Sequence, residues 1–228
     1  MGLNRVDKID EKIKISNVLI SVYDKTNMES LVLGFVNSNP NIRIYSTGGT
    51  YKKIKEILGN NREKHLIRIS DYTRQPEMQG GLVKTLDFKI YLGLLSETYN
   101  MHHEQDLERT GGVVFDMVVV NLYPFEEVIK QSGVNLEDAR ANIDIGGPCM
   151  LRAAAKNFLR VLSVCNPGDY GSVLDELNKN NFEISLTTRF NYARKTFLHT
   201  AEYDRKISEY LKGQSEKIDI YDFQDIRR

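Results

Sequence analysis

One glycine-rich segment of the sequence has the residue types of an anion site. Ser46-Thr47-Gly48-Gly49-Thr50 (STGGT) joins an apolar run to an amphipathic stretch. Glycines let the backbone approach an anion, hydroxyls donate hydrogen bonds, and a helix N-terminus offers unpaired N–H groups and a positive dipole end. Lys25, in the loop after an earlier apolar run, adds a charge. The segment predicts a phosphate site, and an ordinary turn with Thr50 as helix N-cap is the alternative.

A second segment carries residues that could transfer protons. Asn142–Pro148 (NIDIGGP) leads into an alanine-rich helical stretch, with Asp144 before the paired glycines. Arg152 and Lys156 follow four residues apart, on one face of that helix. A carboxylate and a lysine near a backbone anion site can move a proton or hold an anion. The local pattern by itself favours the plainer interpretation, a solvated basic face beside a helix cap.

Histidines and cysteines indicate no further chemistry. His102 and His103 are adjacent and would point about 100° apart on a helix, so they cannot chelate one metal as a pair. Cys149 and Cys165 are the only cysteines, which excludes a disulfide framework and a zinc cluster and fits a reducing, cytoplasmic setting. Neither a dinucleotide fingerprint nor a P-loop motif occurs.

Composition excludes several classes of protein. The 31 Lys and Arg residues balance the 31 Asp and Glu residues, so no excess of positive charge points to nucleic acid or to an anionic membrane surface. A hydrophobic content of 41% with 27% charged residues is that of a globular protein. The longest apolar runs, Phe115–Leu122 and Ile90–Leu95, are far short of the roughly 20 residues of a membrane span. We expect a protein that binds neither nucleic acid nor membrane.

The elements that must position these segments alternate between strand and helix. Strands are predicted at Asn17–Val22, Ile42–Tyr45, His65–Ile69, Asp116–Asn121 (the central one) and Arg160–Cys165. Helices are predicted at Met28–Asn37, Thr50–Leu58, Met150–Phe158, Asp169–Lys179 and Leu186–Leu211. This alternation predicts an α/β fold with a doubly wound, mostly parallel sheet and helices on both faces. Ligands of such a sheet bind beyond the carboxyl ends of the strands, where the predicted anion loop lies.

The chain is expected to form one domain with two flanking segments. Residues 17–211 make up the domain. Residues 1–16 are expected to be a loose N-terminal segment and residues 212–228 a polar C-terminal tail. The apolar residues of the tail, Ile218, Ile220, Tyr221 and Phe223, could dock on a neighbour.

Taken in chain order, nine segments resemble one family. They are SVYDKT at 21–26, STGGT at 46–50, SDYT at 70–73, PEM at 76–78, VKTL at 83–86, NLYPFE at 121–126, NIDIGGP at 142–148, LRAAAKN at 151–157 and HTAEYD at 199–204. Together they resemble the inosine monophosphate (IMP) cyclohydrolase domain, the N-terminal half of a bifunctional purine-biosynthesis enzyme whose other half is AICAR formyltransferase. The resemblance covers roughly residues 17–211 and implies a methylglyoxal-synthase-like fold with additional C-terminal helices.

The resemblance also implies a reaction and the residues that carry it. The reaction is the dehydrative ring closure of 5-formamidoimidazole-4-carboxamide ribonucleotide (formyl-AICAR) to IMP. The implied catalytic residues are Lys84 at the formyl oxygen, with Tyr123, Asp144 and Lys156 around the carboxamide. The implied substrate-binding residues are Ser21, Lys25, Ser46, Thr47, Gly48, Gly49 and Thr50 at the phosphate, Asn121 and Gly146 at the base, and Thr85. The family implies no metal and no cofactor, a homodimer, and a separate AICAR formyltransferase chain as a possible partner.

One segment departs from the family pattern GRVKTLHPKVHGG. Leu82, Asp87, Phe88 and Tyr91 replace its Arg, first His, Pro and second His. Losing the arginine removes bidentate anion binding, and an acidic Asp87 near a phosphate would repel it. These changes motivate an alternative, a catalytically degenerate purine-nucleotide-binding module of the same fold. Methylglyoxal synthase or a carbamoyl-phosphate-synthetase-type effector domain would share the phosphate loop, but NLYPFE, NIDIGGP and LRAAAKN argue against both.

Overall fold

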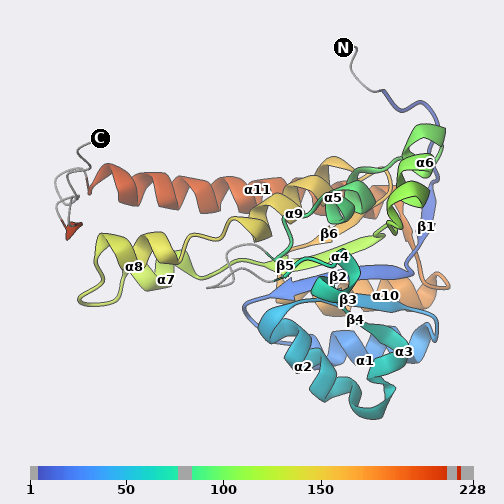
Figure 1. Cartoon of the computed structure of the whole chain (residues 1–228), viewed down its shortest axis with the longest axis horizontal. Helices are drawn as coiled ribbons and strands as arrows, with labels where there is room; N and C mark the ends of the chain where they lie inside the picture. Colours follow the sequence, from blue (N-terminus) through green and yellow to red (C-terminus); the bar gives the residue numbers. More distant parts are fainter. Residues whose placement is uncertain (1–4, 77–83, 215–219, 222–228) are drawn as a thin grey trace.

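Five parallel strands form the main sheet of the computed structural model, which describes residues 5–76, 84–214 and 220–221 (Figure 1). In spatial order the strands are β4 (Leu66–Arg68), β3 (Arg43–Ser46), β2 (Asn17–Val22), β5 (Met117–Asn121) and β6 (Leu162–Val164). The chain starts the sheet in its middle and extends it first toward β4 and then toward β6. This order confirms the doubly wound α/β fold.

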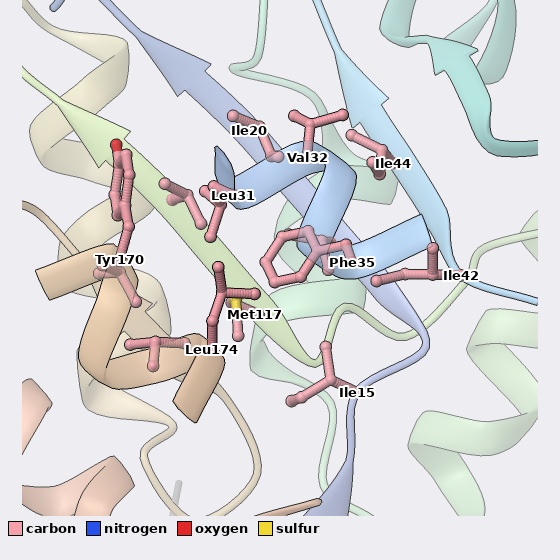
Figure 2. Close-up of a cluster of buried hydrophobic side chains, with 14 of the residues drawn as sticks. Ile15, Ile20, Leu31, Val32, Phe35, Ile42, Ile44, Met117, Tyr170 and Leu174 are labelled. Carbon is pink, nitrogen blue, oxygen red and sulfur yellow. The ribbon is translucent and has the colours of Figure 1, made fainter. Parts of the chain in front are cut away.

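Helices cover both faces of the sheet, which explains why its inner strands are apolar on both sides. On one face, Ile20 of β2 and Met117 of β5 pack with α1 (Met28–Ser38) and α10 (Tyr170–Lys179) (Figure 2). Helix α2 (Gly48–Leu58) contributes to the same cluster. On the other face, Leu19 and Val118 pack with α5 (Phe88–Leu95), α9 (Gly146–Lys156) and α11 (Leu186–Lys212). Successive strand residues therefore serve opposite cores.

The remaining elements are short. They are α3 (Arg62–His65), α4 (Ile69–Thr73), α6 (Met101–Thr110), α7 (Phe125–Ile129), α8 (Leu136–Ala141) and single 3₁₀ turns at Gly59–Asn61 and Pro167–Asp169. The short helices α7 and α8 lie beside the C-terminal part of α11, the longest helix (Figure 1). None of the helices in the described ranges combines the length and apolarity that a membrane crossing requires.

Several element predictions need correction. The strand predicted at Arg160–Cys165 shortens to β6, and the helix predicted at Met150–Phe158 begins at Gly146. The middle strand is β2, and Asp116–Asn121 supplies the neighbouring inner strand β5. Richness in β-branched residues reports burial on both faces, and β2 and β5 share that property, so composition could not rank them. The strand predicted at His65–Ile69 shortens to β4 because His65 ends α3 and Ile69 begins α4.

The N-terminal segment was expected to be loose, and this is wrong for residues 12–16. Strand β1 (Lys12–Lys14) pairs antiparallel with β7 (Glu183–Ser185), and Ile15 is fully buried. The guanidinium of Arg189 in α11, also fully buried, donates hydrogen bonds to the carbonyl oxygens of Asp10, Glu11, Phe158, Leu159 and Ile184. Burial lowers the pKa of Arg189 to about 10. The N-terminal segment is thus tied to the last helix.

The described part of the C-terminal tail contacts helix α8. Tyr221 donates a hydrogen bond to Glu137 of α8 at 2.6 Å, whereas Ile220 is exposed. Ile218 and Phe223, two of the predicted docking residues, lie outside the described residues.

Candidate active site

A cavity of about 320 Å³ opens at the carboxyl ends of β2 and β5, where the strand order changes direction. This is the expected ligand position of a doubly wound sheet, and the volume suits a small molecule. The structure describes all of the predicted site residues and brings most of them to this cavity. Those that line it are Ser21, Lys25, Thr47, Gly48, Gly49, Thr50, Lys84, Thr85, Asn121, Tyr123, Asp144 and Gly146.

The N-terminus of α2 forms the wall of the cavity that was predicted to bind an anion. The helix begins at Gly48, so Thr47 is its N-cap residue and the alternative with Thr50 as N-cap does not hold. Gly48 has a φ of 55°, a conformation that glycine adopts without a steric penalty. A Cβ added at Gly48 would lie 3.1 Å from Nζ of Lys84. A lysine ammonium and a helix N-terminus therefore meet at one point, and both attract an anion.

Two of the hydroxyls predicted to bind phosphate are used inside the fold. Ser46 is fully buried, and its Oγ donates to the carbonyl of Ile20 at 2.8 Å. Thr50 Oγ1 donates to the carbonyl of Val22 at 2.9 Å and accepts the Val22 N–H at 3.0 Å. The structure thus corrects the prediction for Ser46, which does not line the cavity. Thr50 lines the cavity, but its hydroxyl is already hydrogen-bonded to the backbone of Val22.

Asn121 uses its side chain to hold the loop between β2 and α1. Its Oδ1 accepts the N–H groups of Tyr23 and Asp24 at 2.6 and 2.9 Å, and its Nδ2 donates to the carbonyl of Asp24 at 2.8 Å. The buried hydroxyl of Tyr170 makes a further hydrogen bond to Asn121. This loop carries Lys25 into the cavity lining. The side chain of Asn121 therefore supports this loop, and the prediction that the backbone near Asn121 holds a base stays a prediction.

Asp144 is the acidic group of the cavity. Its Oδ1 accepts the N–H of Gly147 at 2.9 Å, and its carboxylate also accepts a backbone hydrogen bond from Tyr123. Burial raises the pKa of Asp144, and these two hydrogen bonds oppose the rise. A Cβ at Gly147 would lie 2.6 Å from the carboxylate, so only glycine leaves room for it. A carboxylate held this way, with a raised pKa, is suited to proton transfer.

Tyr123 faces Asp144 from the end of β5. Burial, and then the charge of Asp144, raise the pKa of Tyr123, so its hydroxyl stays protonated and can donate a hydrogen bond. Its ring stands edge-on to that of Tyr23, with centroids 5.6 Å apart. Tyr23 also lines the cavity and was not among the predicted site residues. Its place one residue after the end of β2 was the signal that could have identified it.

Thr85 joins Lys84 on the wall that follows residues 77–83, which are outside the described part. Thr85 is buried, and its Oγ1 would lie 3.0 Å from a Cβ at Gly146. The small residue at position 146 therefore lets this wall pack against the start of α9. Leu82 and Val83 lie outside the described residues.

Lys156 is not brought to the cavity, contrary to the prediction. It is exposed and is the last of the 11 residues of α9, about 15 Å along the helix from the glycine that begins it. The sequence places Lys156 and Arg152 on one helix face, but that helix leads away from the cavity. Within one chain, Asp144 and Lys156 do not form a pair.

The structure describes three of the four departures from the family pattern, and none of these three lines the cavity. Asp87 is the N-cap of α5, where its Oδ1 accepts the N–H of Lys89 at 2.8 Å, and it does not line the cavity. Because Asp87 does not line the cavity, the structure gives no support to the expected repulsion between Asp87 and a bound phosphate. Phe88 is exposed, and burial raises the pKa of Tyr91, whose hydroxyl lies beside Cys149.

Comparisons with known proteins agree with this geometry. The family model of the MGS-like domain matches residues 27–149, and that of the AICARFT/IMPCHase bienzyme matches residues 154–227. The bifunctional purine biosynthesis protein PurH of Ruminiclostridium cellulolyticum is 42% identical over 206 residues, which are 90% of this chain and 38% of that protein. PurH of Caldicellulosiruptor saccharolyticus is 46% identical over 196 residues, covering 85% of this chain and 36% of that protein.

The chain therefore spans little more than a third of the length of these relatives. A solved structure, the crystal structure of ForH, superposes with a TM-score of 0.76 at 29% identity. The match covers 88% of this chain and 98% of the ForH chain.

Proposed function

The chain belongs to the family of MGS-like domains, and from this premise we propose that it is an IMP cyclohydrolase. Its substrate would be formyl-AICAR and its products IMP and water. One observation carries the proposal: the anion site at Gly48 and Lys84 and the proton-transfer pair of Asp144 and Tyr123 line a single cavity. A ribonucleotide whose phosphate and reacting base are held at opposite ends needs this arrangement.

The reaction makes modest demands on the protein. The carboxamide nitrogen bonds to the formyl carbon, each of the two nitrogens that flank that carbon gives up one proton, and the formyl oxygen leaves with both as water. Because both reacting groups belong to one ring, holding the rotamer in which they meet supplies much of the acceleration. Asp144 accepts the proton from the carboxamide nitrogen, and the Tyr123 hydroxyl donates a hydrogen bond beside it.

Lys84 supplies the positive charge. Its Nζ lies against Gly48, and its flexible side chain gives the ammonium reach along the cavity between the phosphate and the formyl oxygen. Charge that develops on the formyl oxygen in the transition state is stabilised by such a cation more strongly in a partly desolvated cavity than in water.

The proposal extends to partners and setting. The formyl group of the substrate has to be added by a formyl transfer, so an AICAR formyltransferase is the partner reaction, on a separate chain or on further sequence. We also propose that two copies associate, and the exposed Phe197 and Leu198 on α11 offer apolar surface for a contact. Both cysteines are unpaired, which fits a reducing cytoplasm.

A turnover assay of the purified chain with formyl-AICAR, following IMP by absorbance, tests the proposal. We expect turnover, its loss in Lys84→Ala with an unchanged melting temperature, and no effect of Lys52→Ala, a change at an exposed lysine of α2. A folded protein that binds IMP but forms none would overturn the proposal in favour of a nucleotide-binding module. Turnover of dihydroxyacetone phosphate alone would overturn it in favour of methylglyoxal synthase.

A further inference from the structure

Tyr203 of α11 contacts the active-site loop from 59 residues away in the sequence. Its Oη accepts the backbone N–H of Asp144 at 2.8 Å. Only 8% of Tyr203 is exposed, and burial raises the pKa of its hydroxyl to about 12, so the group is neutral near pH 7. The ring stands edge-on to Phe125 of α7, with centroids 6.4 Å apart. Packing therefore fixes the ring and, through it, the position of the hydroxyl.

Three hydrogen bonds from separate parts of the chain hold Asp144. Gly147 at the start of α9 and the backbone of Tyr123 donate to the carboxylate, and Tyr203 accepts from the backbone N–H. The first two fix the carboxylate within the cavity wall. The third fixes the peptide that carries the carboxylate, and it is the only one of the three in which the partner of Asp144 contributes a side-chain atom.

Tyr203 also lies beyond the part of the chain that the MGS-like model matches. That match ends at residue 149, whereas α11 falls within residues 154–227, matched by the bienzyme model. The hydroxyl of Tyr203 is thus a contribution that the added helix makes to a site otherwise built from the sheet and its loops.

We propose that Tyr203 is a positioning residue for the ring closure. It holds the backbone of Asp144 so that the carboxylate meets the proton released by the carboxamide nitrogen. This inference rests on the proposed cyclohydrolase function. Without the hydroxyl, the Asp144 N–H loses its partner and the peptide can rotate, and a displacement of about 1 Å at a catalytic group is enough for a loss of roughly 100-fold. Tyr203 is not among the residues that line the cavity with the proposed anion site, so substrate binding is expected to survive.

The test compares Tyr203→Phe with Tyr210→Phe. Tyr210 is a matched control because it lies on the same helix and also stands edge-on to Phe125, but its hydroxyl faces the carbonyl of Asn135 at 3.5 Å. We expect Tyr203→Phe to lower kcat by roughly 10- to 100-fold with KM changed by less than about 3-fold, and Tyr210→Phe to change neither. Equal melting temperatures of the two variants would exclude a general loss of stability.

A second readout does not depend on turnover. Amide hydrogen exchange at Asp144 is expected to accelerate in Tyr203→Phe and to be unchanged in Tyr210→Phe. If the wild type turns over formyl-AICAR and Tyr203→Phe keeps the full kcat, the positioning role alone is overturned. A wild type without turnover would overturn the proposed function, and unchanged exchange at Asp144 would then overturn the positioning role separately.

Discussion

Nζ of Lys84 lies 3.1 Å from the point that a Cβ of Gly48 would occupy. Gly48 is also in a left-handed conformation, with a φ of 55°. The two residues come from distant segments of the chain, and their close approach places a lysine ammonium at the N-terminus of α2, where we propose that the phosphate binds. The absence of a side chain at position 48 therefore serves both the backbone conformation and the approach of the lysine.

Gly48→Ala is expected to weaken the protein and the site together. The left-handed conformation costs an alanine about 1–2 kcal/mol, and the new methyl group displaces the Lys84 ammonium. We expect the free energy of unfolding to fall by about that amount and KM to rise about 10-fold, measured by urea denaturation and steady-state kinetics.

Gly59→Ala is the matched control for that variant. Gly59 follows the other end of α2 with a φ of 52°, and a Cβ there would meet no atom within 4 Å. Because its ψ of −120° is a conformation that favours glycine even more strongly, Gly59→Ala should cost at least as much stability and leave KM unchanged. A rise in KM in both variants would show that the loss at Gly48 comes from stability and not from Lys84.

Asn121→Ala is expected to release the loop that carries Lys25. The N–H groups of Tyr23 and Asp24 would lose their acceptor, at a cost of about 1–3 kcal/mol. KM should rise more than kcat falls, because Lys25 lines the cavity and its proposed role is to bind the phosphate. The control is Asn178→Ala, whose side chain accepts one hydrogen bond from Ser38 at the surface. An unchanged KM in Asn121→Ala would contradict the supporting role of the amide.

Asp144→Asn is expected to separate activity from stability. Burial raises the folded-state pKa of Asp144 above its unfolded value, so the ionised carboxylate costs stability above that pKa. At pH 7 the asparagine variant should unfold at an equal or higher urea concentration than the wild type. This advantage should shrink as the pH falls through the raised pKa and vanish below about 3.9.

The activity of the same variant should fall by roughly 100- to 10,000-fold, because asparagine cannot accept the proton. Asp175→Asn, at an exposed position on α10, should alter neither property. Retention of activity in Asp144→Asn would remove Asp144 from the proposed chemistry.

Arg189→Met is expected to cost more than about 3 kcal/mol of stability. Methionine keeps much of the aliphatic volume, but it leaves the five carbonyl oxygens that Arg189 bridges without their donor. Arg194→Met, an exposed change on the same helix, should have a small effect. Urea denaturation measures both, and equal midpoints would show that the buried guanidinium does not stabilise the fold.

Elements with a clear apolar period were predictable within a residue or two. The run NVLISV predicts β2 with its observed bounds, and the spacing of Leu31, Val32 and Phe35 predicts α1. Strand β1 was missed because two of its three residues are lysines and because its partner β7 lies far along the chain. Such a pairing forms only after the domain has brought the two segments together, so no local pattern announces it.

The chain by itself determined the type of sheet, the loops that follow its strands and the residue types those loops carry. Only the tertiary structure decided that the Ser46 hydroxyl turns into the core, that α9 carries Lys156 away from the cavity and that Tyr203 reaches Asp144. The physical reason is that periodicity reports which faces of an element are buried. The direction of a helix axis and the contact between two side chains depend on how whole elements pack against one another.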